Sequence, residues 1–336
     1  MATDMKTLVT GATGFIGGNL VRELLRDGVD VRALARASSD TATLSVLGVE
    51  VVVGDLLDES SLERAMEGCD HLYHVAALYR LWTPDPRAFE QVNLQGTRNV
   101  LEAALKVGVG RVVYTSTASV FGHWKGGPIP DEGAIVDVSD IVDGYHRSKF
   151  LAEAEALAYC SRGLPLVIVN PTAPVGPWDV KPTPTGKLVL DFLKGRIPAY
   201  IDTGLNLVHV RDVARGHILA MERGRVGECY ILGNRNVTLK EAFRLLSRIA
   251  HRRAPLLRIP YWVALGTAYM DRWLSGSLLR REPMVPLAGV PIARDPMFYD
   301  SSKAVRELGL PQTPIEEALE EAAAWFREHF KVGIAA

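Results

Sequence analysis

The chain has 336 residues, of which 48% are hydrophobic and 23% are charged, and its formal net charge is −1. This composition is ordinary for a globular protein, and the near-zero charge argues against nonspecific binding of nucleic acid. No apolar stretch approaches the roughly 20 residues that span a bilayer, so we expect no transmembrane segment, and peripheral membrane contact stays open.

Two further features bear on location and partners. The first predicted strand follows the N-terminus without a signal peptide, and Cys69, Cys160 and Cys229 have no CxxC spacing. Both features predict a cytoplasmic protein with reduced thiols. The histidines include no HExxH sequence, so we expect no metal site. We expect the partner to be a small-molecule substrate.

The first half of the chain alternates predicted strands and helices, which is typical of a parallel sheet covered on both faces. The strands are predicted at 6–10, 30–35, 50–53, 71–75, 111–115 and 166–169, and the helices at 15–26, 60–66, 86–107 and 145–159. Ser60 and Glu63 predict a capping box for the second helix. Right-handed crossovers order such strands into an α/β fold with a doubly wound, Rossmann-type sheet.

The second half has a different texture. Residues 171–198 are rich in proline and glycine, and 181–186 are too turn-prone for a long regular element. Further sheet units are predicted at 207–210 and 229–232, with a helix at 213–223, and apolar helices follow from 255 to 330. We therefore predict a Rossmann domain from residues 1–170, to which 206–233 contribute. Residues 171–205 and 234–336 form a smaller, discontinuous substrate lobe.

The segment Thr10-Gly-Ala-Thr-Gly-Phe-Ile-Gly17 lies where the first strand turns into the first helix. Glycines at these positions allow a tight turn, a close approach of the backbone to a pyrophosphate, and close packing of the helix on the sheet. The helix N-terminus adds free N–H groups for phosphate. The segment predicts a dinucleotide site whose contacts come from Gly11, Thr13, Gly14, Phe15, Ile16 and Gly17.

A second motif, Tyr145-His-Arg-Ser-Lys149, places a phenol and an ammonium on one face of a helix. A nearby cation stabilises phenolate, so we expect the pKa of Tyr145 to move towards neutrality. Such a tyrosine can give a proton to a carbonyl oxygen while hydride reaches the carbon. Several hydroxyls at the end of the fifth strand compete to bind that oxygen: those of Thr115, Ser116, Thr117 and Ser119. Strand alternation places Thr115 and Thr117 on one face and Ser116 on the other.

Four further pieces occur in order with these motifs: Gly54-Asp55-Leu56, His74-Val-Ala-Ala77, Asn93-Leu-Gln-Gly-Thr97 and Asn170-Pro-Thr172. The ordered set resembles the extended short-chain dehydrogenase/reductase superfamily. The resemblance implies Tyr145 as acid/base, Lys149 on the nicotinamide ribose and Thr117 at the usual Ser/Thr position. It also implies cofactor contacts from Asp55, Leu56, Ala76, Asn93, Thr115 and Pro171.

The residues after the second strand bear on the choice of cofactor. An acidic residue there would bind the ribose 2′-hydroxyl of NAD, but the sequence has Arg36 and Ser38. Both side chains suit a 2′-phosphate, so we expect NADP to be preferred over NAD. The alternative is an arginine that stacks on adenine, which NAD tolerates.

Two groups within the superfamily resemble the chain: the dihydroflavonol-reductase-like oxidoreductases, and the nucleotide-sugar epimerases and dehydratases. Residues 181–186 and 198–214 resemble the bacterial proteins labelled hopanoid-associated sugar epimerases. Epimerases commonly carry an arginine before the strand at 207–210, where this chain has Leu205-Asn206; Arg294 is only a loose replacement. We therefore expect hydride transfer between the nicotinamide and a secondary alcohol or carbonyl of an apolar, isoprenoid or hopanoid-related metabolite. The alternative activities are an NAD-retaining epimerase and a cofactor sensor without catalysis.

The substrate contacts and the oligomeric state are predicted from position alone. Candidate substrate residues are Tyr79, Arg80, Trp82, Asn170 and Lys187. One helix carries an apolar stripe that packs in the core or lines a lipophilic cleft; it contains Trp262, Val263, Leu265, Tyr269, Met270, Trp273 and Leu274. The resemblance implies a homodimer built from the helices at 86–107 and 145–159.

Overall fold

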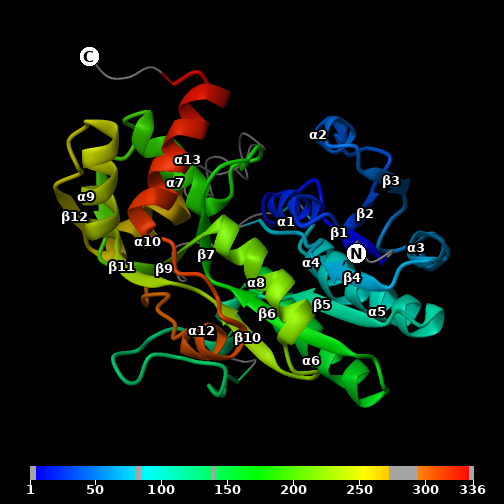
Figure 1. Cartoon of the computed structure of the whole chain (residues 1–336). Coiled ribbons are helices and arrows are strands. Elements are labelled where there is room, and N and C mark those ends of the chain that lie inside the picture. Colours follow the sequence, from blue (N-terminus) through cyan, green and yellow to red (C-terminus); the bar gives the residue numbers. More distant parts are fainter. Residues whose placement is uncertain are drawn as a thin grey trace.

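A seven-stranded parallel sheet forms one half of the molecule in the computed structural model (Figure 1), with strand order β10-β6-β5-β4-β1-β2-β3. The structure describes residues 5–80, 83, 85–137, 141, 143–271 and 294–332, without the side chains of 268–271. The strands are β1 (Lys6–Thr10), β2 (Asp30–Ala35), β3 (Glu50–Val53), β4 (His71–His74), β5 (Arg111–Thr115), β6 (Leu166–Pro171) and β10 (Cys229–Leu232). The predicted doubly wound Rossmann sheet is confirmed.

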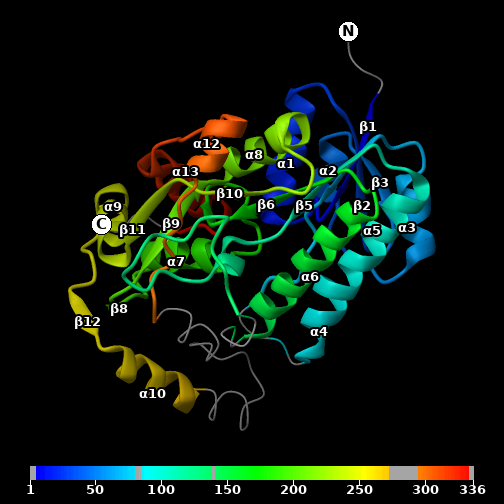
Figure 2. The same cartoon turned by 90° about the horizontal axis from the view of Figure 1, so that it is seen from below.

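Helices cover both faces of this sheet (Figure 2). One face carries α1 (Phe15–Arg26) and α8 (Val210–Arg223), and the other carries α3 (Glu59–Met66), α5 (Gly96–Val107) and α6 (Gly144–Ser161). Each face has its own apolar core, because neighbouring strand residues point to opposite sides. Val9 and Val113 pack in the first core, whereas Leu8 and Val112 pack in the second. Two short helices, α2 (Ala42–Val46) and α12 (Ser302–Leu308), lie at the edges.

The second lobe is built on a three-stranded sheet of order β11-β9-β7 and a two-stranded sheet of β12 and β8. These strands are β7 (Ala173–Val175), β8 (Ala199–Ile201), β9 (Gly204–His209), β11 (Arg235–Thr238) and β12 (Leu257–Ile259). Its helices are α7 (Pro184–Leu193), α9 (Leu239–Ala250), α10 (Tyr261–Asp271) and α13 (Ile315–His329). Of the further sheet units predicted after residue 206, β10 joins the main sheet and β9 lies in this second one.

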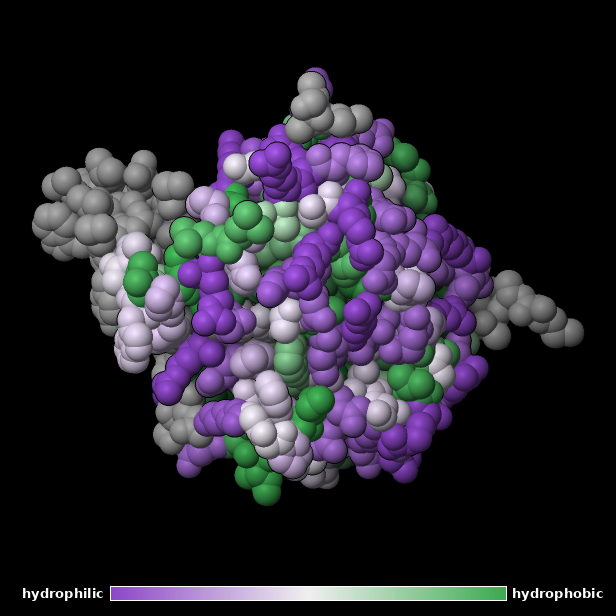
Figure 3. Space-filling view, turned by 90° about the vertical axis from the view of Figure 1, so that its left-hand side faces the viewer, coloured by the Kyte–Doolittle hydropathy of each residue, from purple (hydrophilic) through white to green (hydrophobic). Residues whose placement is uncertain are grey.

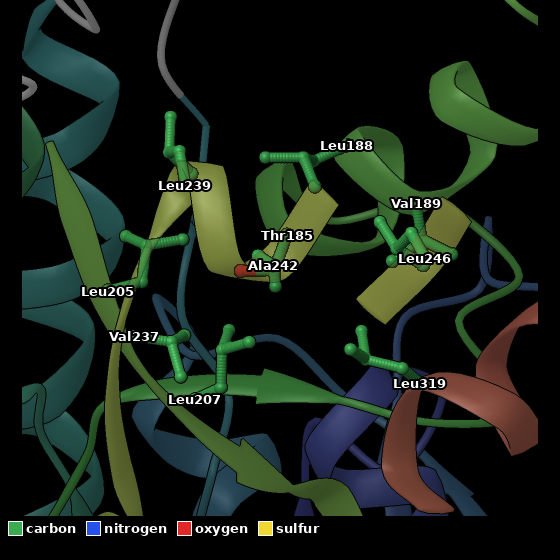
Figure 4. Close-up of a pocket in the computed structure, with 10 residues that line it drawn as sticks. All are labelled: Thr185, Leu188, Val189, Leu205, Leu207, Val237, Leu239, Ala242, Leu246 and Leu319. Atoms are coloured by element: carbon green, nitrogen blue, oxygen red, sulfur yellow. The ribbon is translucent and has the colours of Figure 1, made fainter. Parts of the chain in front are cut away.

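The core of the second lobe contains a small apolar cavity of about 10 Å³ (Figure 4). Side chains from α7, β9, β11, α9 and α13 surround it, including Leu188, Leu207 and Leu246. A space of this size holds about one water molecule, and its apolar walls offer that water no hydrogen bonds. We therefore regard it as a packing void.

The predicted helix at 86–107 is wrong as one continuous α-helix. It consists of α4 (Arg87–Phe89), a π-helical turn η1 (Glu90–Gln95) and α5. A π-turn inserts an extra residue into the helix, and such turns are frequent at functional sites. The turn contains Asn93, whose side chain leaves the helix to bind two other segments.

Two local predictions about helix starts are also wrong. The cap of α3 is Asp58, whose carboxylate accepts hydrogen bonds from the Ser61 N–H at 3.3 Å and the Ser60 hydroxyl at 2.8 Å. Ser60 therefore lies inside the first turn. The turn-prone segment at 181–186 starts a regular helix, α7, because Pro184 sits where no N–H is needed and Thr183 caps the Gly186 N–H at 3.2 Å.

Candidate active site

The glycine turn between β1 and α1 leaves no room for side chains. Gly11 has a φ of +74°, and a Cβ there would lie 2.7 Å from the Ala76 nitrogen. A Cβ on Gly17 would lie 2.2 Å from the Gly11 oxygen. Gly14 begins α1 in an extended conformation without a side-chain cap, so the first N–H groups of the helix have no side-chain acceptor. These features fit the pyrophosphate of a dinucleotide.

Lys149 lies on α6 with only 1% of its surface exposed. Its Nζ donates to the Tyr114 hydroxyl at 2.8 Å and to the Thr115 carbonyl oxygen at 2.6 Å. Burial lowers the pKa of Lys149 to about 7, although the negative charge of Glu153 opposes that shift. The ammonium is therefore held at the carboxyl end of β5 by two protein oxygens.

Tyr145 precedes Lys149 by one helical turn and is only partly covered. Its ring lies 4.8 Å from the ring of Tyr79 and 6.4 Å from that of Phe89. Burial and nearby negative groups raise the pKa of Tyr145 well above its ordinary value, and a hydrogen bond with Thr117 opposes the rise. The expected lowering of this pKa is therefore not produced by the protein groups alone.

Thr115 and Thr117 have different surroundings. β5 ends at Thr115, whose hydroxyl lies 2.9 Å from His217 Nε2 on α8. Thr117 caps the short 3₁₀ helix η2 (Ala118–Phe121), and its hydroxyl lies 3.0 Å from that of Ser119. The alternation of a strand does not extend beyond its last residue. Of the two threonines, Thr117 is the one that reaches Tyr145.

A buried chain of hydrogen bonds connects the glycine turn to the π-turn. Thr10 Oγ1 accepts from the Ala76 N–H at 3.2 Å and lies 2.9 Å from His74 Nδ1. His74 Nε2 lies 3.1 Å from Thr97 Oγ1, which donates to the Asn93 carbonyl at 2.6 Å. Because the Thr97 proton is used there, we assign the donated proton to Nε2 of a neutral imidazole. Burial lowers the pKa of His74 to about 3, in agreement.

Asn93 joins the loop after β4 to α6. Its Oδ1 accepts from the Leu78 N–H at 2.7 Å, and its Nδ2 donates to the Leu78 carbonyl at 3.2 Å and the Ser148 hydroxyl at 3.0 Å. These bonds use both donors of the amide and one of the two acceptor positions on its oxygen. Asn93 therefore fixes the loop that faces Tyr145, and its predicted contact with the cofactor stays a prediction.

Glu153 is a buried residue that the sequence analysis missed. It lies on α6 one turn beyond Lys149, and its Oε2 accepts from Asn170 Nδ2 at 2.7 Å. The same Nδ2 donates to the Thr117 carbonyl at 3.2 Å. Burial raises the pKa of Glu153, while its hydrogen bonds and the charge of Lys149 act in the opposite sense. The regular spacing from Tyr145 through Lys149 to Glu153 was the available signal.

A second missed cluster adjoins Tyr145. Asp143 caps α6, and its Oδ2 lies 2.5 Å from His146 Nδ1. The His146 ring lies edge-on to the rings of Tyr145, at 5.0 Å, and His123, at 6.4 Å. Burial opposes ionisation of Asp143, but the hydrogen bond and charge of His146 hold its pKa below the ordinary value. His146, interpreted from sequence as a packing residue, thus belongs to a polar group beside the phenol.

Asp179 is the third missed residue. It is almost fully buried; its Oδ2 accepts from the N–H and the hydroxyl of Thr183, both at 2.8 Å, and its Oδ1 has no protein partner among the described residues. Burial raises its pKa to about 6, against those hydrogen bonds. The preceding Trp178 has a φ of +72°, which is unusual for a bulky side chain. The turn is tied to α1, since Asn19 donates to the Pro177 carbonyl at 3.2 Å.

Comparisons with known proteins agree with this geometry. The family described as "NAD dependent epimerase/dehydratase family" matches residues 7–233. The chain belongs to this family. It is an enzyme of the extended short-chain dehydrogenase/reductase type, which confirms the resemblance seen in the sequence.

Similar proteins cover nearly the whole chain. It is 47% identical to a Synechocystis protein provisionally named dihydroflavonol 4-reductase, over 96% of this chain and 94% of that protein. It is 38% identical to sterol demethylase protein B of Methylococcus capsulatus, over 96% and 99%. The crystal structure of gox2253 superimposes with a TM-score of 0.87 at 43% identity, over 98% and 100% of the chains.

The remaining predicted cofactor residues of this family member surround the same sheet edge. Arg36 is exposed directly after β2, and its guanidinium has no partner among the described residues. Asp55 Oδ1 accepts from the Leu57 N–H at 2.9 Å, and the Leu56 carbonyl accepts from Asn99 at 2.9 Å. Pro171 ends β6 and is buried. Their contacts with the cofactor stay predictions.

The predicted substrate residues have different environments. Tyr79 is 45% exposed and lies against Tyr145, and Arg80 follows it on the surface. Asn170 is completely buried behind Thr117. Lys187 lies on the exposed side of α7 and pairs with Asp191 of the same helix. Trp82 lies outside the described residues, as do the side chains of Tyr269, Met270, Trp273 and Leu274.

In the described ranges, the structure contains neither a candidate metal site nor a membrane-spanning helix. No group of three or more His, Cys, Asp or Glu side chains there could hold a metal ion. Within the same ranges, no helix is long and apolar enough to cross a bilayer.

Proposed function

We propose that the protein reduces or oxidises an apolar carbonyl or secondary alcohol with NADP(H). The observation that carries the proposal is the placement of Tyr145 between the Thr117 hydroxyl and the exposed ring of Tyr79, one turn before the buried Lys149. An acid/base group, an oxygen-binding hydroxyl and an aromatic wall therefore meet at the carboxyl edge of a dinucleotide-binding sheet, where such ligands bind.

In this mechanism the bound nicotinamide supplies or accepts the hydride. Tyr145 donates its phenolic proton to the carbonyl oxygen during reduction, and Thr117 donates a second hydrogen bond to the same oxygen. Because protein groups raise the pKa of Tyr145, the phenol stays protonated at neutral pH and is ready to donate. Lys149 is fixed by Tyr114 and Thr115 at the carboxyl end of β5, one helical turn after Tyr145, where it would hold the nicotinamide ribose, as the family resemblance implies.

The substrate class is supported by two lines of argument. The rings that contact Tyr145 are aromatic: Tyr79, which is 45% exposed, and the buried Phe89. The names of the relatives refer to a dihydroflavonol and to a sterol, which are ring compounds with large apolar surfaces. We therefore propose a lipophilic ring compound, of isoprenoid or hopanoid-related type, as substrate.

The alternative is an epimerase that retains NAD and shows no net redox change. The family description favours it, because the family includes epimerases. The interior of β9 argues against a nucleotide-sugar as substrate. At the place where epimerases carry an arginine for the diphosphate, this chain has Asn206, which is completely buried and forms a hydrogen bond with Asn236 at 2.7 Å. A nicotinamide absorbance band that survives purification, without consumption of added NADPH, would favour the epimerase.

Replacing Tyr145 by phenylalanine tests the proposal. The hydroxyl is the proposed proton donor, so we expect turnover to fall by at least about a thousandfold, the upper part of the range for general acid catalysis. Cofactor affinity should change little. Activity is measured as NADPH oxidation over a panel of lipophilic ketones and aldehydes beside nucleotide-sugars. Tyr79→Phe is the control; a Tyr145→Phe enzyme that keeps a tenth of the activity would refute the role of Tyr145.

The preference for NADP is proposed from Arg36. Its unpaired guanidinium is exposed at the end of β2, where the ribose 2′-phosphate of a bound dinucleotide is expected. A charge-assisted hydrogen bond is worth about 1.5–3 kcal/mol, so Arg36→Ala should raise the KM for NADPH about tenfold or more. The KM for NADH should stay within about twofold. An equal effect on both cofactors would contradict the preference.

The cytoplasmic location, the homodimer and the division into a cofactor domain and a substrate lobe stay predictions. The dimer prediction concerns α5 and α6, which are linked within one chain by an ion pair between Arg98 and Glu155. Sedimentation equilibrium of the purified protein would test it.

A further inference from the structure

One edge of the second lobe exposes several large apolar side chains. The apolar edge consists of Leu256, Leu257, Trp262 and Val263, which lie at the start of β12 and in the first turn of α10. Leu256 is 93% exposed, Trp262 75% and Leu257 62%. Single exposed apolar residues are normal, but four within eight positions of the chain are not explained by chance exposure.

The helix beside this edge is strongly basic on its outer face. Lys240, Arg244 and Arg248 are spaced four residues apart along α9, so they share one exposed face, and Arg253 follows the helix. We call these four residues the basic stripe. None of them forms an ion pair with any described residue. The opposite face of α9 packs in the lobe core through Phe243, Leu246 and their neighbours.

The surroundings of the basic stripe leave its charge largely uncompensated. Glu241 is the acidic residue of α9, and Arg244 acts on it electrostatically, so it offsets one of the four positive charges of the stripe. Asp202 on the neighbouring strand turn pairs with Arg258. Arg252 lies against Gly195, next to the exposed and unpaired Arg196, which adds further positive charge.

The apolar edge and the basic stripe lie on the same side of the molecule. Figures 1 and 2 both place α9 and β12 along the same outer edge of the second lobe, and Figure 2 shows α10 continuing from β12 on the side away from α9. Figure 3 looks onto this side and shows strongly hydrophilic residues directly beside apolar ones. An anionic partner with an apolar interior satisfies both parts of such a surface.

We propose that this side of the second lobe docks peripherally on an anionic lipid bilayer. The apolar edge enters the interfacial layer, where tryptophan and leucine side chains are stabilised, and the basic stripe binds the lipid phosphates. A bilayer is favoured over a protein partner because it accepts both aliphatic and aromatic side chains without a shaped pocket. The proposal does not depend on the reaction that the enzyme catalyses.

Vesicle sedimentation of the purified full chain tests the proposal. We expect binding to vesicles of equal parts phosphatidylglycerol and phosphatidylcholine, with at least about tenfold weaker binding to phosphatidylcholine alone and to the anionic vesicles in high salt. The double variant Leu256→Ser/Leu257→Ser should bind at least about tenfold more weakly, because fully burying one leucine changes an equilibrium by that factor or more. Arg248→Gln/Arg253→Gln should lose about fivefold per charge.

Matched controls separate this surface from general stickiness. Val46→Ser/Val53→Ser removes two exposed aliphatic side chains at the far end of the Rossmann sheet, and Arg64→Gln/Arg306→Gln removes two exposed charges elsewhere. Both should bind like the wild type, and thermal unfolding of all four should be unchanged. The proposal is overturned if the wild type does not sediment with anionic vesicles, or if the leucine variant binds like its control. Self-association that the leucine variant abolishes would also overturn it, by assigning the edge to a second copy.

Discussion

Lys149 carries an ammonium group into a position with almost no contact with solvent. Two hydrogen bonds, to Tyr114 and Thr115, do not fully replace the lost hydration, so burial lowers its pKa to about 7. The unfolded chain binds the proton up to its ordinary pKa of 10.5. Between these two values the unfolded state carries more protons, so the stability of the fold falls as the pH is lowered.

Lys149→Met therefore has a stability effect that depends on pH. The free energy of unfolding of Lys149→Met should exceed that of the wild type by more at pH 6 than near pH 10.5. At pH 6 the wild type carries the full cost of burying the charge, whereas near pH 10.5 that cost has vanished. The difference should shrink by on the order of 5 kcal/mol across this range, since one pKa unit corresponds to about 1.4 kcal/mol. Urea denaturation of both proteins measures it. A difference that is constant with pH would show that the lysine is not buried as a perturbed cation.

Residues of the site differ in how far the sequence could predict them. Tyr145 and Lys149 were accessible because their spacing on one helix has a chemical reason. Glu153 continues the same spacing and could have been predicted from it. Asp143 and Asp179 could not, because burial distinguishes Asp143, and burial with a long-range contact distinguishes Asp179. Asp179, for example, is enclosed by Thr183 and lies near Tyr79, 100 positions earlier in the chain. A single carboxylate in a proline-rich loop has no sequence pattern that indicates this.

At the scale of elements, the π-turn η1 and the loop after β4 act as one unit. Asn93 leaves the helical surface and binds both backbone groups of Leu78, and Ser148 of α6 completes the contact. Thr97 and His74 tie the same turn to β1 through the buried chain of hydrogen bonds. This unit holds Tyr79 beside Tyr145, so its rigidity bears directly on the site.

Asn93→Ala should cost about 3 kcal/mol of stability. It removes three hydrogen bonds of the buried Asn93 amide, two with the Leu78 backbone and one with Ser148, and each is worth about 0.5–1.5 kcal/mol. The matched control is Asn99→Ala on α5, whose side chain donates to the Leu56 carbonyl at 2.9 Å and accepts from Gln95 Nε2 at 2.8 Å. Gln95 is exposed, so water can replace its bond, and the change should cost about 1 kcal/mol. Urea denaturation compares them, and equal losses would contradict the special role of Asn93.

Element boundaries were predicted well where hydrophobic periodicity and turn residues agree. The bounds of β1, β2, β3, β5 and α1 match the prediction, because each lies between clear glycine or charged turns. The helix at 86–107 failed because a π-turn keeps helical periodicity while changing its hydrogen bonds. The start of α3 shifted because Asp58 and Ser60 are both good capping residues and only the backbone conformation selects between them.

At the scale of the whole molecule, the two lobes differ in how far apart in the chain their paired strands lie. The Rossmann sheet is built from consecutive strand-helix units, so its order follows from handedness rules. The second lobe joins β7, β9 and β11, together with β8 and β12, from separate parts of the chain. Short strands of three or four residues carry little pattern, and their pairing depends on packing against α7, α9 and α13. The sequence could therefore predict a second lobe but not its sheets.

The two lobes are proposed to have different roles in the reaction. The sheet edge supplies the glycine turn, Thr117, Tyr145 and Lys149, whereas the loop with Asp179 connects this edge to the second lobe. Net hydride transfer to substrate is the claim on which this division depends. An epimerase would use the same residues but return the hydride in every cycle.

Transfer of an isotopic label tests that claim most directly. The measurement follows deuterium from NADPH that carries two deuterium atoms at the nicotinamide C4 position into product, using whichever lipophilic ketone or aldehyde of the panel is reduced fastest. We expect one deuterium on the new carbinol carbon for each NADPH consumed, and none with the Tyr145→Phe enzyme. Product that forms without NADPH consumption and without deuterium on that carbon would contradict it.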